Sequence, residues 1–248
     1  MPGYRLIDIP SGPFTRAKVA RFADLSDDVL AHWTKEGLLQ PINDASGTGR
    51  HKEFDQLEVH KASALKQMRG FGCNIDALRW FASIVDRGRM IAEESTHFPL
   101  HRIWELGSIL SSYNYFLEGK HIAIPESIDG EFVEVPARGL EDIAQYQLRG
   151  GEEKVNQEEL ADAIRIVMKY RSKLDYQAMK VGPSFSANYI VDPRVNAILL
   201  IWPTPNGWEL YEDSDANMSG LRNPPVAGIM IYITRVLRNL WSIHERLI

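Results

Sequence analysis

The chain has 248 residues with a formal net charge of −5, and 44% of its residues are hydrophobic and 25% charged. This is an ordinary composition for a soluble globular protein, and the length allows one large domain or two small ones. No apolar run approaches the ~18 residues that a membrane-spanning helix needs. The N-terminus also lacks the basic start and apolar stretch of a signal peptide. We therefore expect a cytoplasmic protein with no membrane partner.

The number of cysteines and the distribution of charge further restrict the possible classes of protein. The single cysteine, Cys73, excludes an intrachain disulfide framework and any site that needs several thiolates. Residues 1–100 hold 13 Lys and Arg against 13 Asp and Glu, whereas residues 101–248 hold 15 against 20. Bulk charge therefore does not favour nucleic-acid binding, which would require local clustering of cations in the first part of the chain.

The first predicted elements are short helices. Segment 15–23 has helical spacing and begins at Thr15, a good N-cap. Residues 38–53 then lack helical spacing and contain turn residues, which predicts a hairpin. Helical spacing resumes over 54–70, and Asn74 is placed to cap the helix that follows.

Segment 26–36 is the second short helix. Ser26 is its expected N-cap, and Gly37 is expected to end it from the position after the last helical turn. Leu30 and Trp33 are spaced to point inward. A short helix, a tight turn, a second helix and a basic hairpin form the layout of a winged helix-turn-helix.

At this point the sequence resembles the MerR family of bacterial transcription regulators. The resemblance covers about residues 14–90 and rests on Leu30 and Trp33, then Gly37-Leu38-Leu39 and Pro41, the basic loop Gly49-Arg50-His51-Lys52 with Phe54, and "ALKQMRGFGCNIDAL" at 64–78. It implies a DNA-binding homodimer that regulates transcription. Two family arginines are absent, because Ala31 and Ile42-Asn43 stand where the family commonly carries them.

Candidate DNA contacts follow from this layout. If Leu30 and Trp33 are buried, the outward stripe of the second helix could read base edges: Asp28 a cytosine amino group, His32 guanine and Ala31 a thymine methyl group. The alternative is a solvated helix face. Cations of the basic loop would meet phosphates, and the start of the first helix is a weaker candidate for the same contact. The predicted DNA-binding residues are Thr15, Arg16, Asp28, Ala31, His32, Lys35, Arg50, His51 and Lys52.

The segment 99–118 carries an apolar seam of about two heptads. Its spacing of 3-4-3-4 is produced by Ile103, Leu106, Leu110, Tyr113 and Leu117. Two interpretations stay open. The seam could join two copies of the chain, so that two recognition helices read an inverted-repeat operator, or the helix could pack on its own domain.

The remaining segment, 120–248, mixes strand and helix patterns. Strands are expected at "HIAIP" and "EFVEVP", and a helix over 156–174. Further strands are expected in "SFSANYIVD", "NAILLIW" and "GWELYED", and a final helix from Gly228. Aromatic residues gather here and could line a pocket for a flat organic ligand, or could fill a core: Tyr189, Trp202, Trp208, Tyr211 and Tyr232.

Enzymatic and metal-binding patterns are missing. The sequence has no nucleophile elbow, no phosphate-cradling glycine loop and no His-Glu-x-x-His motif. We therefore expect no catalytic residue, no metal site and no cofactor. Cys73 is expected to be a small buried hydrophobe rather than a sensor.

The sequence thus predicts an α+β protein. Residues 1–90 form a MerR-like winged helix-turn-helix, 91–119 a linker and dimerisation helix, and 120–248 an α/β module of uncertain fold that binds an effector or partner. The predicted function is sequence-specific binding of double-stranded DNA by a homodimeric transcription regulator, with a small-molecule or protein effector possible. The alternatives are a DNA-architectural or phage-type accessory protein without an effector, and a protein-interaction module tethered to DNA.

Overall fold

The computed structural model shows an α+β fold made of two compact units. One unit contains residues 1–86 and 181–248, and the other contains residues 87–180. The structure describes residues 9–43, 52–95, 97–107, 121–125, 132–136, 157–170, 172–186, 190, 197–205, 207–213 and 228–244. The division differs from the predicted boundaries 1–90, 91–119 and 120–248, because the C-terminal segment joins the N-terminal unit.

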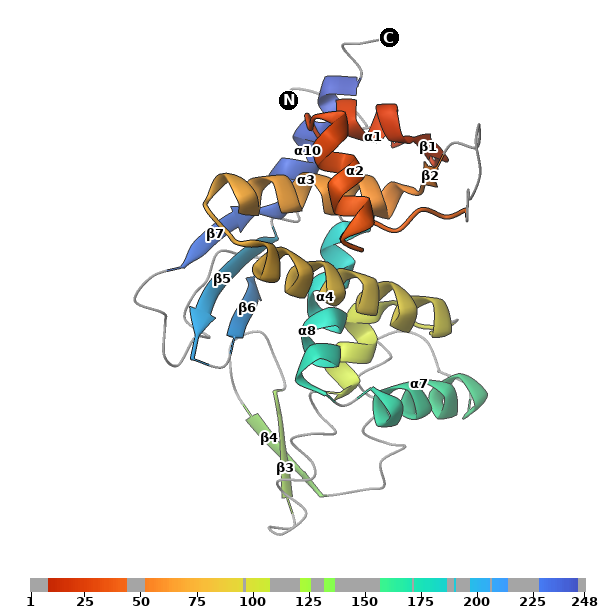
Figure 1. Ribbon diagram of the computed structural model, residues 1–248. Coiled ribbons are helices and arrows are strands. Elements are labelled where there is room, and N and C mark those ends of the chain that lie inside the picture. Colours follow the sequence, from red (N-terminus) through yellow and green to blue (C-terminus); the bar gives the residue numbers. More distant parts are fainter. Residues whose placement is uncertain are drawn as a thin grey trace, which may run out of the picture. The chain divides into compact units, whose positions relative to one another are not determined.

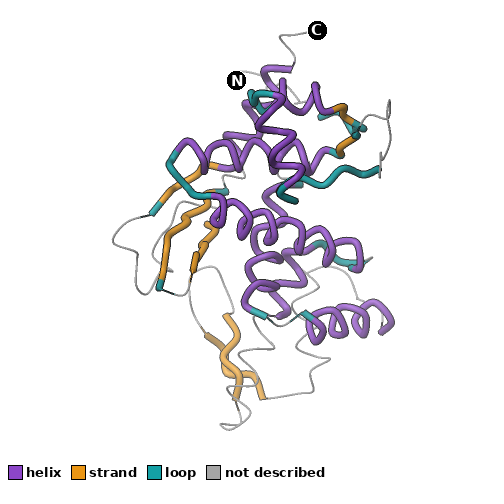
Figure 2. Tube along the Cα trace, in the orientation of Figure 1, coloured by secondary structure: helices purple, strands orange, loops and turns teal. Residues whose placement is uncertain are grey.

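The first unit combines the N-terminal helices with a small C-terminal sheet (Figures 1 and 2). Its elements in chain order are β1 (Phe14–Thr15), α1 (Arg16–Phe22), α2 (Asp27–Lys35), β2 (Glu53–Phe54), α3 (Gln56–Gly70), the first part of α4 (Ile75–Glu94), η1 (Gly182–Phe185), β5 (Ile198–Thr204), β6 (Gly207–Asp213), β7 (Ile229–Tyr232) and α10 (Ile233–His244).

Local side-chain caps set where α1 and α2 begin. The Thr15 hydroxyl accepts a hydrogen bond from the Lys18 amide at 3.4 Å, and the Ser26 hydroxyl accepts one from the Val29 amide at 3.3 Å. These bonds satisfy amides that have no partner inside the helix. These two predicted N-caps are therefore confirmed, and so is Asn74, whose side-chain oxygen accepts from the Ala77 amide at 2.9 Å.

The end of α2 is fixed by Gly37, as the sequence predicts. Gly37 has a φ of +73°, which a residue with a Cβ adopts only at a cost. Its amide donates to the Thr34 carbonyl at 3.2 Å, and the Leu38 amide donates to the Trp33 carbonyl at 2.9 Å. This is the Schellman pattern, and it turns the chain so that Leu38 and Leu39 enter the core with 0% and 1% exposure.

The predicted hairpin is described only at its base. β2 pairs antiparallel with β1, with Phe14 opposite Phe54. Beside this ladder the Ile42 amide donates to the Glu53 carbonyl at 2.8 Å, and the Asn43 side-chain oxygen accepts from the Glu53 amide at 3.0 Å. These bonds hold the two ends of the loop together, while residues 44–51 lie outside the described part of the chain.

The C-terminal part of this unit differs from the prediction in two places. The expected final helix begins as a strand, because Ile229–Tyr232 is β7 and pairs antiparallel with β5 in a sheet of order β6-β5-β7. Ile, Met and Tyr fit a pleated sheet when a partner strand is at hand, and α10 starts only at Ile233. Ser184 and Phe185, expected in a strand, lie in the 3₁₀ helix η1.

α10 packs on the N-terminal helices although it comes from the other end of the chain (Figure 1). Trp241 is fully buried there, and its ring centroid lies 6.0 Å from that of Phe14 and 5.5 Å from that of Phe22. Phe14 and Phe22 in turn meet edge to face at 5.7 Å. This aromatic cluster ties β1, α1 and α10 into one core.

The second unit contains the rest of α4, a helix whose described part is 100–107, β3 (His121–Pro125), β4 (Phe132–Pro136), α7 (Gln157–Lys169) and α8 (Lys173–Val181). β3 and β4 form the expected strands and pair antiparallel. The expected helix 156–174 is divided in two, because Ser172 and Asp175 form a capping box that starts α8. The Ser172 amide donates to the Asp175 carboxylate at 2.9 Å, and the Asp175 amide donates to the Ser172 hydroxyl at 3.2 Å.

Candidate nucleic-acid interface

The outer face of α2 carries a polar stripe. Leu30 and Trp33 are 0% and 1% exposed, so the opposite side of the helix faces solvent. Asp28, His32 and Lys35 are exposed on that side, and Ala31 is half-buried beside them. α2 is therefore oriented as the sequence predicts, while contact between these side chains and bases stays a prediction.

A buried charged network holds the chain where it leaves α2. The Lys61 ammonium group lies 2.9 Å from the Glu58 carboxylate and also pairs with Asp86. The other Glu58 oxygen accepts from the Gln40 amide at 2.8 Å, and the Gln40 side-chain amide donates to Asp86 at 3.0 Å. The Lys61 and Glu58 side chains are both 0% exposed. Gln40, which directly follows the turn after α2, is thus anchored to α3 and α4.

A buried histidine joins α3 to the C-terminal segment. The His60 Nδ1 atom lies 2.9 Å from the Phe185 carbonyl oxygen, and the Trp241 indole N–H donates to His60 Nε2 at 2.9 Å. These partners are consistent with a neutral ring that carries its proton on Nδ1. Burial lowers the pKa of His60 to about 4, against a smaller raising effect of the Phe185 hydrogen bond. The ring therefore stays uncharged at neutral pH.

Sequence reasoning missed both buried groups. It treated both residues only as part of the predicted helix over 54–70. The signal that could have found the Lys61 network is the i, i+3 spacing of Glu58 and Lys61 on one helix. Nothing local in the sequence indicates that Asp86 or Trp241 supplies the distant partner.

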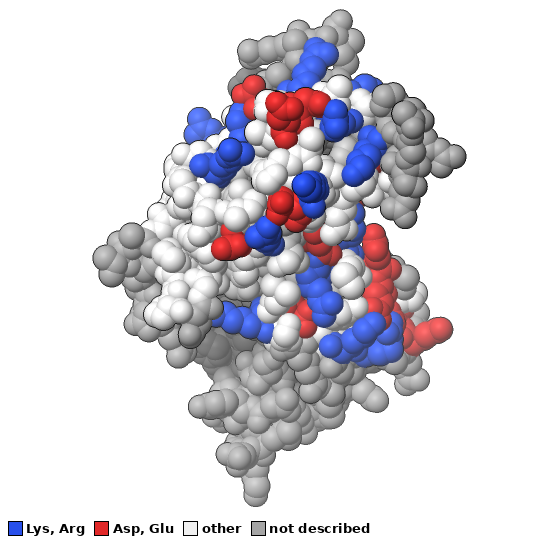
Figure 3. Space-filling model, viewed as in Figure 1, with Lys and Arg blue, Asp and Glu red and all other residues white. Residues whose placement is uncertain are grey.

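Acidic and basic side chains alternate around the start of α2. Arg16 binds Asp27 through two hydrogen bonds, Nε to Oδ1 at 3.0 Å and Nη2 to Oδ2 at 2.5 Å. Both side chains are about half exposed, so the pair contributes little to stability and Arg16 can exchange its partner. Figure 3 shows Lys and Arg interspersed with Asp and Glu over this face rather than a continuous basic patch.

Further cations are exposed on neighbouring elements of the first unit. Lys52 is exposed at the base of the hairpin, whereas Arg50 and His51 lie outside the described residues. Lys18 and Arg21 on α1 are also exposed. The sequence prediction omitted these two, although their i, i+3 spacing opposite buried Val19 and Ala20 would have identified an outward basic edge.

The chain also matches a known family over this region. Residues 14–82 match the model of the MerR HTH family regulatory proteins. Residues 14–82 are a MerR-family helix-turn-helix domain. The family match supports the interpretation that the protein is a DNA-binding transcriptional regulator. No curated protein matches the chain.

The predicted dimer seam lies outside this MerR-family domain. Ile103 and Leu106 are both 0% exposed in the single chain. Other parts of the same chain therefore cover both side chains, which favours the interpretation that this helix packs on its own domain. Leu110, Tyr113 and Leu117 lie beyond the described residues.

The aromatic residues proposed for a ligand pocket do not share one face of the sheet. Tyr211 is opposite Leu200, and Tyr232 is opposite Ile198, so both lie on the face of Trp202, since alternate β5 residues share a face. Trp208 is opposite Pro203 and therefore lies on the other face. The fifth residue, Tyr189, is outside the described part of the chain. Trp208 therefore cannot line the same side of the sheet as the other three.

The described residues can also be compared with the requirements of a reactive thiol, a metal site and a membrane-spanning helix. Cys73 is buried, and burial raises the pKa of its thiol, which disfavours the reactive thiolate. Among the described residues, no three His, Cys, Asp or Glu side chains gather as a metal site. No described helix is both long and apolar enough to cross a bilayer.

Proposed function

We propose that this protein is a cytoplasmic transcriptional regulator that binds double-stranded DNA sequence-specifically as a homodimer, through a winged helix-turn-helix. The observation that carries the proposal is the orientation of α2 within a MerR-family domain: Leu30 and Trp33 are buried, while Asp28, His32 and Lys35 face solvent. A recognition helix must present such a polar stripe to enter the major groove.

The side chains divide into two roles under this proposal. His32, Asp28 and the Ala31 methyl group read base edges, and Lys35 lies at the rim of the groove. Arg50, His51 and Lys52 meet phosphates of the flanking backbone, and they position the protein without reading sequence. Arg16 joins them when it exchanges Asp27 for a phosphate, and the exposed Thr15 hydroxyl lies beside it.

Selection of bound duplexes from a random library, followed by titrations at several salt concentrations, tests this assignment. Arg50→Ala should weaken binding to all sequences alike and lower the salt slope by about one unit. His32→Ala should instead change the base preference. Arg69→Gln is the matched control, because Arg69 is an exposed cation at the end of α3 and is not one of the predicted DNA contacts.

Two results would contradict the groove assignment. The first is that no duplex is retained even at low salt. The second is that His32→Ala and Arg50→Ala have equal effects on every sequence, because base readout and phosphate contact must differ in sequence dependence.

The homodimer is tested separately. A two-fold dimer would read two half-sites about one helical turn apart, so selected sequences should be inverted repeats. Light scattering of the free and DNA-bound protein should report two chains per complex. A monomer bound to a single half-site would overturn this part of the proposal. Because Ile103 and Leu106 are already buried within the single chain, replacing Leu110 or Leu117 is the sharper test of the predicted seam.

A further inference from the structure

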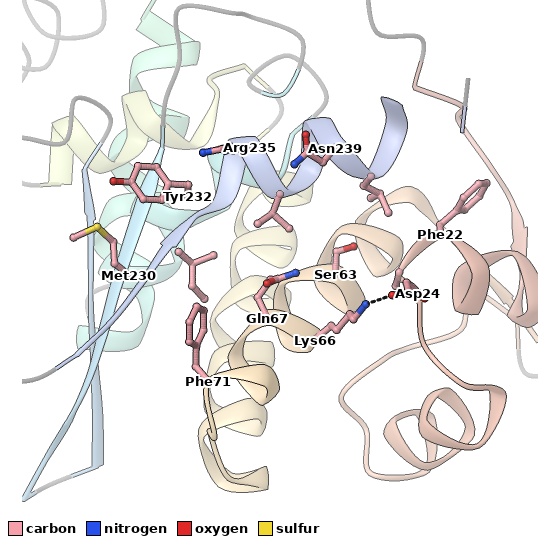
Figure 4. Close-up of a pocket in the computed structure, with 14 residues that line it drawn as sticks. Phe22, Asp24, Ser63, Lys66, Gln67, Phe71, Met230, Tyr232, Arg235 and Asn239 are labelled. Carbon is pink, nitrogen blue, oxygen red and sulfur yellow. Dashed lines mark hydrogen bonds and ion pairs between the residues drawn. The ribbon is translucent and has the colours of Figure 1, made fainter. Parts of the chain in front are cut away.

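A groove of about 400 Å³ lies between the α1–α2 turn, α3, β7 and α10 (Figure 4). All of its lining residues belong to the first unit. Its volume is within the usual range for small-molecule sites. None of the residues proposed to contact DNA lines it.

One part of the groove is apolar and open to solvent. Phe71, Met230 and Tyr232 line it with exposures of 60%, 40% and 49%. They are three of the five large hydrophobic side chains that are exposed among the described residues. Single exposed apolar residues are common, but their concentration around one hollow marks a binding surface.

A second part offers unused polar groups. Ser63 on α3 lines the groove and is only 6% exposed, yet its hydroxyl donates no hydrogen bond to any described residue. Gln67, one turn further along α3, likewise makes no side-chain hydrogen bond within the described part. Figure 4 shows both residues on α3 where it faces α10. Side-chain donors that line a groove and have no partner among the described residues can hydrogen-bond a polar ligand.

The charges of the groove favour an anion. Lys66 pairs with Asp24 at 2.5 Å, but the Asp24 side chain is 92% exposed, so the pair is weak and a ligand carboxylate can take its place. Arg235, exposed on the first turn of α10, has no carboxylate partner among the described residues. The lining of the groove therefore contains two cations and one acid.

We propose that this groove binds a small organic anion with an apolar body, such as an aromatic carboxylate. The ring lies against Phe71 and Tyr232, and the carboxylate is attracted by the two cations of the lining, Lys66 and Arg235. Asp24 belongs to the turn between α1 and α2 and has a φ of +50°. Displacing it from Lys66 removes a restraint on that turn. The ligand therefore weakens DNA binding, a regulatory step that rests on the proposed function.

Calorimetry on the full chain tests the ligand with 2-naphthoate, the cation 2-naphthylmethylamine and neutral 2-naphthalenemethanol as probes. The carboxylate should bind saturably and with a higher affinity than either matched probe. Arg235→Gln and Lys66→Gln should each weaken it about tenfold, the usual effect of losing one charge-assisted hydrogen bond. Arg69→Gln, an exposed cation outside the groove, should leave the affinity unchanged. Equal binding of the amine, or wild-type affinity in Arg235→Gln, overturns the site.

The regulatory step is measured with the selected duplex. As 2-naphthoate saturates the wild type, it should weaken DNA binding by up to about fivefold, and Arg235→Gln should need about tenfold more ligand for the same effect. Unchanged DNA affinity overturns the coupling. The two proposals fail separately: Lys35→Gln should lower DNA affinity and leave naphthoate binding intact. A chain that binds naphthoate through Arg235 but retains no duplex contradicts the proposed function and supports the groove.

Discussion

Each of the two units contains a cluster of charged side chains that connects its helices. The two clusters differ in how deeply they are buried. The Lys61 cluster (Glu58, Lys61 and Asp86) lies in the first unit, and its Glu58 and Lys61 side chains are 0% exposed. The Glu94 cluster lies in the second unit, where Glu94 meets Lys169 at 2.7 Å, Arg165 at 2.7 Å and the Tyr170 hydroxyl. Lys169 and Arg165 are more than half exposed.

The comparison shows that equal ion-pair geometry does not imply equal importance. Water screens the Glu94 cluster and can replace any lost partner, so single deletions there are tolerated. In the Lys61 cluster, loss of the Lys61 ammonium group leaves the buried Glu58 carboxylate with no cation to neutralise it. The stability of the first unit is therefore more sensitive to single charge changes. The Lys61 cluster also holds Gln40, which follows the turn after α2.

The largest expected effect comes from Lys61→Met. Removing the ammonium group leaves two acids without their cation, and we expect a loss of about 3–5 kcal/mol in the free energy of unfolding. Chemical denaturation of the full chain measures it. The triple variant Glu58→Gln, Lys61→Met, Asp86→Asn should lose less than Lys61→Met alone, because no unpaired charge remains. A triple variant as unstable as the single one would contradict this account.

The second largest expected effect is a pH dependence of the free energy of unfolding, which is caused by His60. Its pKa falls from 6.5 to about 4 on folding, mainly through burial, so the unfolded chain binds the proton more tightly. The contribution of the neutral His60 ring to the free energy of unfolding is fully present above pH 6.5. It is lost as the pH falls towards about 4, by roughly 3 kcal/mol in total.

His60→Gln provides the control for that window. Its unfolding free energy should change less between pH 7 and pH 4 than that of the wild type, since glutamine does not titrate. Parallel pH profiles for the two proteins would show that His60 is not the titrating group. The Trp241→Phe variant, which keeps His60, should retain a pH dependence but lose the donor to Nε2.

The smallest effect is expected in the Glu94 cluster. Hydrogen bonds from Lys169, Tyr170 and Arg165 lower the pKa of Glu94 to about 2. Its contribution to stability is therefore present above its ordinary pKa of 4.5 and is lost as the pH falls through about 2. Lys169→Met should raise this pKa in a carboxylate NMR titration and change the unfolding free energy far less than Lys61→Met does. A larger loss than that of Lys61→Met would reverse the comparison.

The local elements of the first unit were readable in advance because their signals are local. Thr15 and Ser26 cap helices through amides three residues away, and Gly37 supplies the conformation that ends α2. The spacing of Leu30 and Trp33 likewise fixed which side of α2 is buried. The strand β7 was missed because its conformation depends on β5, about thirty residues earlier in the chain.

What the chain determined by itself is the helix-turn-helix and the stripe it presents, since caps, turns and helical periodicity act within a few residues. Only the tertiary structure decided that Lys61 and His60 are buried, that Ile103 and Leu106 are covered within the single chain, and that a groove forms beside the α1–α2 turn. Each of these depends on partners far away in sequence, such as Asp86 and Trp241, and burial of a charged or polar group is tolerated only where such a partner arrives.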